Sequence, residues 1–261
     1  MPSVTETTFI GIDLAWRSEK NPSGGAVLKG DRQGAHLVDV TVSLASSQVL
    51  SYIENHMAAS TYVAVDAPLI IANRTGQRSC ETLISRQYGA RHASCHASNL
   101  SLYPRAAGVD LASQLIVLGF RHAPESTNSE DRRVLIEVYP HPALLELFQL
   151  PRIIKYKKGN VAQRRSGQRE LQQRIRELSR LVPPLKLTAM LGDFLATNTD
   201  SLAGRDLKSY EDGLDAIVCA YVAYHCWFWG PHGARLFGDV NSGYILVPIH
   251  TQTTSEGSDT Q

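Results

Sequence analysis

Acidic side chains stand in three segments of the sequence that otherwise have the composition of buried β-strands. Asp13 in "FIGIDLAW", Asp66 in "TYVAVDAPL" and Glu137 in "VLIEVYPHP" each follow a run of apolar residues. An unpaired carboxylate costs free energy in an apolar setting, so such a group usually has a hydrogen-bonded partner, a cation or a catalytic task. If the three strands lie side by side in a parallel arrangement, their acids converge at the end of the sheet where ligands bind.

A second acidic pair strengthens this expectation. Asp212 and Asp215 are three positions apart, so on a helix they share one face, and they fall within the first turn of a helix expected over "SYEDGLDAIVCAYVAYHCWFW". Aspartate at a helix start is also a favourable capping residue, which offers a purely structural explanation of the pair. Glu137 has a structural alternative too, because it can reach solvent at a strand end or bond the basic segment that follows.

Carboxylates gathered at such density repel one another unless divalent cations neutralise them, and oxygen-rich sites suit Mg²⁺ or Mn²⁺. Two such ions about 3.5–4 Å apart can activate a water molecule and stabilise the leaving oxygen of a phosphodiester. Asp13, Asp66, Asp212 and Asp215 are therefore the predicted metal ligands. The same four acids and Glu137 are the candidate catalytic residues.

One basic segment accompanies the acids. Ten of the residues from 152 to 180 are Lys or Arg, and only Glu170 and Glu177 are acidic. Such a run is commonly a solvated helix face, but cations beside an acidic metal site are also what a nuclease needs to hold an anionic strand. The expected phosphate contacts are Lys157, Lys158, Arg164 and Arg165.

The order of the elements predicts how these residues are positioned. Three β-runs joined by short turns occupy residues 8–44, a helix with one apolar face follows, and residues 61–66 form a further strand. Residues of about 70–130 are polar with weak helical signals, as expected for a helical insertion. A strand ending at Glu137, four more helices and a closing strand at "GYILVPI" complete one domain over residues 1–249, and residues 250–261 have the composition of a disordered tail.

Composition bounds the class of protein. The chain has 261 residues, 43% of them hydrophobic, and a net charge of +1, so overall charge does not identify a nucleic-acid partner. Its four cysteines show no CxxC pairing, which favours reduced thiols and a cytoplasmic location. No apolar run approaches the roughly 20 residues that span a bilayer, so no membrane partner is expected. The oligomeric state is left open.

At this point the residues resemble a known family. The motifs "GIDLAW", "VAVDAPL", "EVYPHPAL", "KYKKG", "EDGLDAIVCAYVA" and "GYILVP" are similar to those of domain-of-unknown-function family 429, whose members are described as predicted nucleases of RNase H fold. The resemblance runs from about residue 8 to 249 and is weakest over 90–130. It implies an α/β fold with an RNase H-like mixed five-stranded sheet flanked by helices.

The resemblance also implies roles for the acids. In RNase H-like domains the first strand carries a catalytic Asp, which corresponds to Asp13. In the Holliday-junction resolvase branch a second acid lies on the fourth strand, matching Asp66, and two more lie one turn apart on the last helix, matching Asp212 and Asp215. Glu137 has no counterpart in that pattern.

Two functions of different classes follow from the sequence. The favoured one is a metal-dependent nuclease that hydrolyses phosphodiester bonds of DNA or RNA at a two-metal carboxylate site. The alternative is a non-catalytic or phosphometabolite-binding protein of the same fold, in which the acids cap helices, pair with Lys157 and Lys158, or recognise a phosphorylated metabolite. Few aromatic residues are available to stack on a single strand, which favours the alternative.

Overall fold

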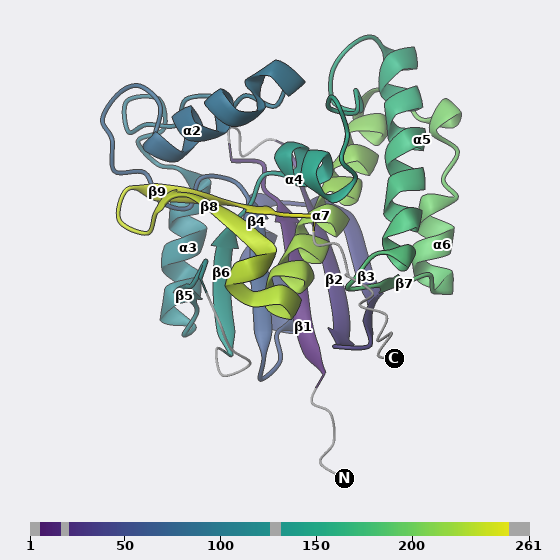
Figure 1. The fold of residues 1–261 in the computed structure, drawn as a ribbon, viewed down its shortest axis with the longest axis horizontal. Helices are drawn as coiled ribbons and strands as arrows, with labels where there is room; N and C mark the ends of the chain where they lie inside the picture. The colour runs from purple at the N-terminus through teal and green to yellow at the C-terminus, as the bar shows by residue number, and fades with distance from the viewer. Residues whose placement is uncertain (1–5, 17–20, 126–131, 251–261) are drawn as a thin grey trace, which may run out of the picture.

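The structure is a computed structural model that describes residues 6–16, 21–125 and 132–250. It has a mixed α/β architecture in which a mostly parallel seven-stranded sheet is flanked by helices (Figure 1). The predicted disordered tail lies outside the described residues from position 251 onward.

The large sheet has the strand order β5-β6-β4-β1-β2-β3-β7. Strands β1, β2 and β3 form the expected antiparallel meander, whereas β1, β4, β6 and β5 run parallel to one another, as do β3 and β7. Its members are β1 (Thr7–Asp13), β2 (Ser23–Asp31), β3 (Gly34–Leu44), β4 (Thr61–Asp66), β5 (Arg121–His122), β6 (Arg133–Glu137) and β7 (Leu185–Lys186). The two-residue strands β5 and β7 gave no periodic signal in the sequence.

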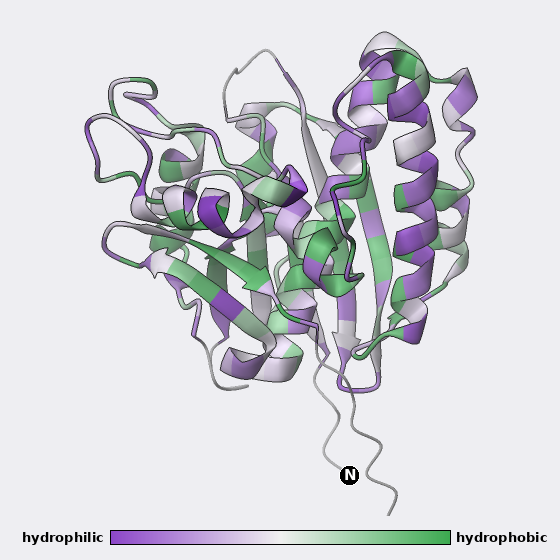
Figure 2. Ribbon diagram, turned by 45° about the horizontal axis from the view of Figure 1, so that its top comes forward, coloured by the Kyte–Doolittle hydropathy of each residue, from purple (hydrophilic) through white to green (hydrophobic). Residues whose placement is uncertain are grey.

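Helices cover both faces of this sheet. One apolar core lies under α1 and α3, and the other lies under α2, α4, α5, α6 and α7. The bounds are α1 (Val49–His56), α2 (Ser79–Tyr88), α3 (Ala107–Val117), α4 (Pro140–Leu147), α5 (Val161–Glu177), α6 (Ala189–Leu195) and α7 (Gly204–Trp229). Figure 2 shows hydrophobic residues on the central strands and hydrophilic residues along much of α5. None of the described helices is both long and apolar enough to cross a membrane.

The parallel strands β1, β4 and β6 end together. Asp13 is the register partner of Asp66, and Val65 is that of Glu137, so the acid-bearing positions meet at one edge of the sheet as predicted. Side chains of β1 alternate between the two cores, with Phe9 in one and Ile10 in the other. Strands buried on both faces are apolar throughout, which makes an acid at their ends conspicuous in the sequence.

Helix α7 crosses the centre of the sheet in direct contact with its backbone. A Cβ atom on Gly11 of β1 would lie 2.1 Å from the carbonyl oxygen of Ala216, and one on Gly24 of β2 would lie 2.2 Å from that of Asp212. Only glycine permits so close an approach of helix to strand. These two contacts bring the acidic turn of α7 to the end of β1.

The sequence-based start of α7 was wrong. The helix begins at Gly204 rather than near Ser209, so Asp212 and Asp215 lie in its third and fourth turns and cannot cap its start. The start of the helix has little apolar surface, because Arg205, Asp206 and Lys208 are polar, and it therefore gave no helical pattern in the sequence. The structural explanation of the acidic pair as helix caps is therefore removed.

The predicted insertion forms α2, α3 and their connections beside the carboxyl end of β6. A separate hairpin of β8 (Ala234–Asp239) and β9 (Gly243–Pro248) packs on α2, as Figure 1 shows. The closing strand was predicted at β9, but its partner β8 was missed. Leu246 of β9 forms an isolated parallel bridge with Val138, which ties the hairpin to the end of β6.

Candidate active site

The four predicted aspartates approach one another at a single pocket. β1 supplies Asp13, β4 supplies Asp66, and one face of α7 supplies Asp212 and Asp215. The two residues from α7 are 3% and 0% exposed, so their carboxyl groups are held away from bulk water. Three of the four predicted ligands, Asp13, Asp66 and Asp212, line the pocket directly.

Lys157 links two of these acids. Its Nζ lies 2.7 Å from Oδ2 of Asp215 and 3.6 Å from Oδ2 of Asp66. The preceding Tyr156 is fully buried and donates a hydrogen bond of 2.7 Å from Oη to Oδ1 of Asp215. The backbone at residues 155–156 also packs against Gly167 of α5, where a Cβ atom would lie 2.5 Å from it. The "KYKKG" loop is thus anchored on both sides, and Lys157 is aimed into the acids.

Lys208 binds Asp212 and the neighbouring Glu211. It lies one turn before Asp212 on α7 and donates hydrogen bonds to the Asp212 carboxylate and, over 2.9 Å, to Glu211. Arg164 of α5 reaches the second oxygen of Glu211 at 3.2 Å. Asp13 has one carboxylate oxygen that is buried without a hydrogen-bond partner among the described residues.

Electrostatics of the pocket favour bound protons or cations. Burial first, and then the charge of Asp13, raise the pKa of Asp212 to about 8, although Lys208 opposes the shift. Burial also raises the pKa of Asp66 to about 8, although Lys157 opposes the shift. Burial acts to lower the pKa of Lys157, but the surrounding carboxylates, Asp215 foremost, raise it well above its usual range. The acids therefore hold positive charge tightly.

The pocket has a volume of about 610 Å³. Its floor is formed by the ends of β1, β4 and β6, one wall by the insertion, and the opposite wall by the "KYKKG" loop and the start of α7. His141 also lines it. That side chain is 5% exposed, and burial followed by the charges of Lys157 and Lys158 lowers its pKa well below 6.5, so the imidazole is neutral.

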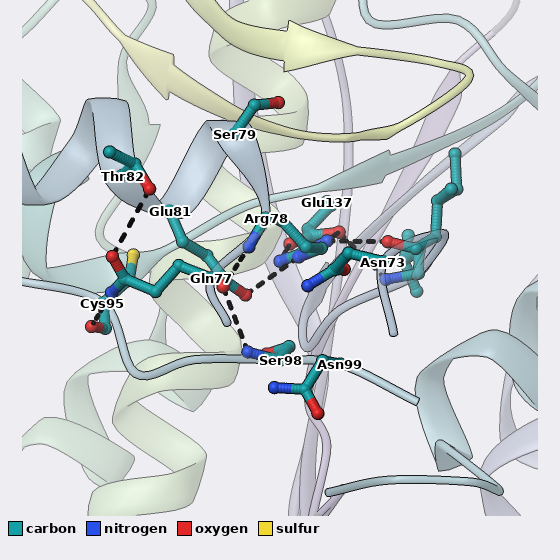
Figure 3. Close-up of polar contacts among 12 residues, drawn as sticks. Asn73, Gln77, Arg78, Ser79, Glu81, Thr82, Cys95, Ser98, Asn99 and Glu137 are labelled. Carbon is teal, nitrogen blue, oxygen red and sulfur yellow. Dashed lines mark hydrogen bonds and ion pairs between the residues drawn. The ribbon is translucent and has the colours of Figure 1, made fainter. Parts of the chain in front are cut away.

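Glu137 lines the same pocket but is held by an arginine. Its two oxygens accept hydrogen bonds of 2.6 and 2.9 Å from Arg78, and Oε2 also accepts one of 2.9 Å from the backbone N–H of Leu69 (Figure 3). Arg78 in turn bonds Glu81 at 2.8 Å. This buried ion pair gives a second explanation of why a strand carries Glu137, and its catalytic role stays a prediction.

The predicted phosphate contacts divide into two groups. Lys157 and Lys158 line the pocket, whereas Arg164 binds Glu211 behind it. Arg165 donates two hydrogen bonds, of 3.0 and 2.6 Å, to the carbonyl oxygen of Leu202 and so ties α5 to the segment before α7. Part of the basic segment therefore faces the acids, and part of it holds the structure together.

Sequence reasoning missed several residues of the pocket. Arg205 and Lys208 extend its basic wall, Trp16 lies at its rim, and Arg78 holds its insertion wall. Lys208 had a readable signal, because a basic residue four positions before Asp212 is a favourable helical pair once the helix is known to start at Gly204. Arg78 had none, since its partner Glu137 lies 59 positions away.

Within the described ranges, no three His, Cys, Asp or Glu side chains are already arranged to hold a metal ion. Lys157 and Lys208 contact the acids that were predicted to be ligands. All four cysteines are free thiols, in agreement with the prediction that they form no disulfides.

Fold and pocket together define a mixed α/β protein with a cluster of aspartates and lysines at the carboxyl edge of its parallel strands. The chain belongs to the family described as "Protein of unknown function (DUF429)", whose profile matches residues 11–239. The family predicted from the motifs is thereby confirmed. No curated protein and no solved structure matches the chain.

Proposed function

We propose that this protein is a metal-dependent nuclease of RNase H-like fold. The observation that carries the proposal is the convergence of Asp13, Asp66 and the Asp212–Asp215 pair on one pocket whose wall is basic. The antiparallel β1–β3 meander, the parallel β4 beside β1 and the acidic face of α7 are the arrangement that an RNase H-like domain requires.

The chemistry of the four acids suits Mg²⁺ or Mn²⁺, although no three of them are arranged around one ion in the described residues, so an ion would have to draw them together. They are hard oxygen donors, and one buried oxygen of Asp13 has no hydrogen-bond partner in the described part of the chain and is one that a cation would satisfy. A divalent ion would be held by Asp13, Asp66, Asp212 and Asp215, and it would supply Lewis-acid activation of a water molecule. Lys157 and Lys208 now provide the countercharge, so their ammonium groups are the ones that must move aside when an ion enters.

The chain's own residues have separable roles in this proposal. Lys158, Arg205 and a displaced Lys157 bind the phosphate oxygens of the strand and orient them towards the acids. Tyr156 holds Asp215 in place through its hydrogen bond, and Arg164 does the same for Glu211. His141 stays neutral in the pocket lining, because burial and the charges of Lys157 and Lys158 disfavour its protonated form.

The test combines binding with cleavage. Metal-free protein is titrated calorimetrically with Mn²⁺, and labelled DNA and RNA, as single strands, duplexes and junctions, are assayed with Mg²⁺ and with Mn²⁺. We expect heat of binding and cleavage in the parent, loss of both in Asp13→Asn, and no change in Asp110→Asn, which alters an exposed carboxylate on α3. A parent that binds no Mn²⁺ at millimolar concentration and cuts nothing refutes the nuclease.

One observation favours the alternative function, a phosphometabolite-binding protein. The lysines already neutralise the acids, and a pocket of about 610 Å³ lies in the size range of small-ligand sites. In that case the calorimetric titration shows no Mn²⁺ binding, while phosphorylated metabolites bind in EDTA and Lys158→Ala weakens them.

A further inference from the structure

The insertion closes the site on the side of β6. Five of its residues line the pocket, namely Arg78, Glu81, Cys95, His96 and Ser98. They are fixed to the strand end through Arg78, which is 2% exposed and bridges Glu137 and Glu81. Oε2 of Glu81 accepts a further hydrogen bond of 3.0 Å from the backbone N–H of Ser98, as Figure 3 shows. The insertion is thus a wall anchored by a buried ion cluster.

The wall on the other side is basic and belongs to different elements. It consists of Gly204, Arg205 and Lys208 at the start of α7 together with Lys157 and Lys158. The acids lie on the floor between the two walls. In the described part of the chain the acids are reached through a pocket of about 610 Å³, which is in the size range of sites that hold small molecules.

The lining of the pocket also includes apolar and aromatic residues. Trp16, Pro68 and Tyr139 give it apolar surface within the same cavity as the lysines. The Trp16 ring packs edge-on against Tyr103, with the ring centroids 4.8 Å apart, which fixes its orientation. Cations beside a fixed aromatic ring suit a ligand that carries both a phosphate and a flat base.

We propose that the pocket accepts a single nucleotide unit, with its phosphate at Lys158 and Arg205 and its base against Trp16. This inference rests on the proposed nuclease and names its substrate class, the terminal nucleotide of a single strand. Cleavage there adds water across the terminal phosphodiester. The water oxygen bonds to phosphorus, the bond to the departing sugar oxygen breaks, that oxygen takes the proton, and a mononucleotide leaves.

Cleavage assays distinguish a strand end from an internal position. A linear single strand, a covalently closed circular strand of the same sequence and a blunt duplex are incubated with the protein and Mn²⁺. We expect mononucleotides from the linear strand and at least ten-fold slower cleavage of the other two. Equal cleavage of the circle overturns the inference and leaves the nuclease standing, whereas no cleavage of any substrate, DNA or RNA, overturns the nuclease.

Binding assays test the pocket without relying on activity. Adenosine and thymidine monophosphates, and a short linear oligonucleotide, are titrated in EDTA and followed by tryptophan fluorescence and calorimetry. Stacking on Trp16 predicts that Trp16→Ala weakens nucleotide binding by roughly 5- to 150-fold, and that Trp16→Phe restores most of it. If the free monophosphates bind more tightly than the oligonucleotide, the ligand of the pocket is a free nucleotide rather than the end of a strand.

A matched pair of lysine variants completes the test. Lys158 and Lys155 are both exposed and lie three positions apart, but only Lys158 lines the pocket. Lys158→Ala should weaken binding of the monophosphates, and Lys155→Ala should leave it unchanged. Equal effects of the two substitutions, or binding that is indifferent to Trp16→Ala, refute the placement of the nucleotide in this pocket even if metal-dependent cleavage is found.

Discussion

The buried cluster of Arg78, Glu81 and Glu137 allows a sharp prediction about stability. Replacing Arg78 with Met removes hydrogen bonds to both carboxylates and to the carbonyl oxygen of Ile70. Two carboxylates that are 1% and 2% exposed then lack their cation. Removing one partner of a buried ion pair typically costs 3–5 kcal/mol, so we expect Arg78→Met to lower the free energy of unfolding by about that amount.

Glu137→Gln should cost less than Arg78→Met. Glu81 remains to neutralise the guanidinium, so the loss is confined to weakened hydrogen bonds to Arg78 and a poorer acceptor for Leu69, worth about 1–3 kcal/mol. Arg78→Met should therefore lose more stability than Glu137→Gln, because one arginine neutralises two glutamates in this cluster. If Glu137 were present only for chemistry, its substitution would leave stability unchanged.

An exposed ion pair provides the control. Arg169 and Asp200 are joined over the same 2.6 Å as Arg78 and Glu137, but their side chains are 47% and 66% exposed. A pair in water contributes about 0–1 kcal/mol, so Arg169→Ala should have little effect. At an equal distance, the exposed pair differs from the buried one in its exposure and in having one hydrogen bond to the carboxylate rather than two.

Urea unfolding at pH 7, followed by circular dichroism, measures all three variants. The deficit of Arg78→Met should shrink as the pH falls, because burial raises the pKa of Glu137 and its uncompensated carboxyl group then takes up a proton in the folded state. If Arg78→Met loses too much stability to fold, the comparison of Glu137→Gln with Arg169→Ala tests the prediction by itself. Equal costs for Glu137→Gln and Arg169→Ala would show that the reasoning from burial is wrong.

Three further predictions concern single side chains. Burial lowers the pKa of His225 to about 4, below its unfolded value of 6.5, so its stabilising contribution is present above pH 6.5 and is lost as the pH falls towards 4. In unfolding experiments from pH 7 to 4, His225→Gln should therefore lose up to about 3 kcal/mol less stability than the parent protein. An equal loss of stability in the two proteins contradicts this prediction. Lys157→Met should lower the thermal midpoint of unfolding in EDTA, because Asp215 loses its cation. The same substitution should tighten Mn²⁺ binding in calorimetry, because the lysine no longer competes with the ion. Weaker Mn²⁺ binding would mean that the lysine does not compete with the ion. Asp66→Asn should leave the midpoint in EDTA unchanged or raised, because Lys157 keeps Asp215, but should abolish the rise caused by Mn²⁺; a strongly destabilised variant would identify Asp66 as a structural partner instead.

The central strands could be predicted because their signals are local. The apolar runs around Asp13 and Asp66 are strands bounded by turn residues, and their acids were expected to converge because parallel strands end at one edge. The register that makes Asp13 the partner of Asp66 follows from that arrangement. Local patterning also placed the helix of Asp212 and Asp215, although not its start.

The pocket walls could not be predicted, because they depend on contacts between distant segments. Arg78 meets Glu137 across 59 positions, and Arg165 binds a backbone carbonyl, a partner with no signature in the sequence. Lys157 was expected to bind phosphate in the favoured interpretation and to pair with the acids in the alternative one, and it pairs with Asp66 and Asp215. Composition reveals that cations are present but not which anion each one contacts.

The contacts of Gly11 and Gly24 with α7 have a consequence for how the pocket responds to charge. Because main chain touches main chain, the spacing between the acidic turn of α7 and the end of β1 is the shortest that the two backbones allow. Repulsion among the carboxylates at that spacing is relieved by what is bound, whether protons, lysine ammonium groups or a metal ion. The site behaves as a receptor of fixed shape and variable occupancy, and a single methyl group at position 11 or 24 would change the spacing of its acids without altering any of them.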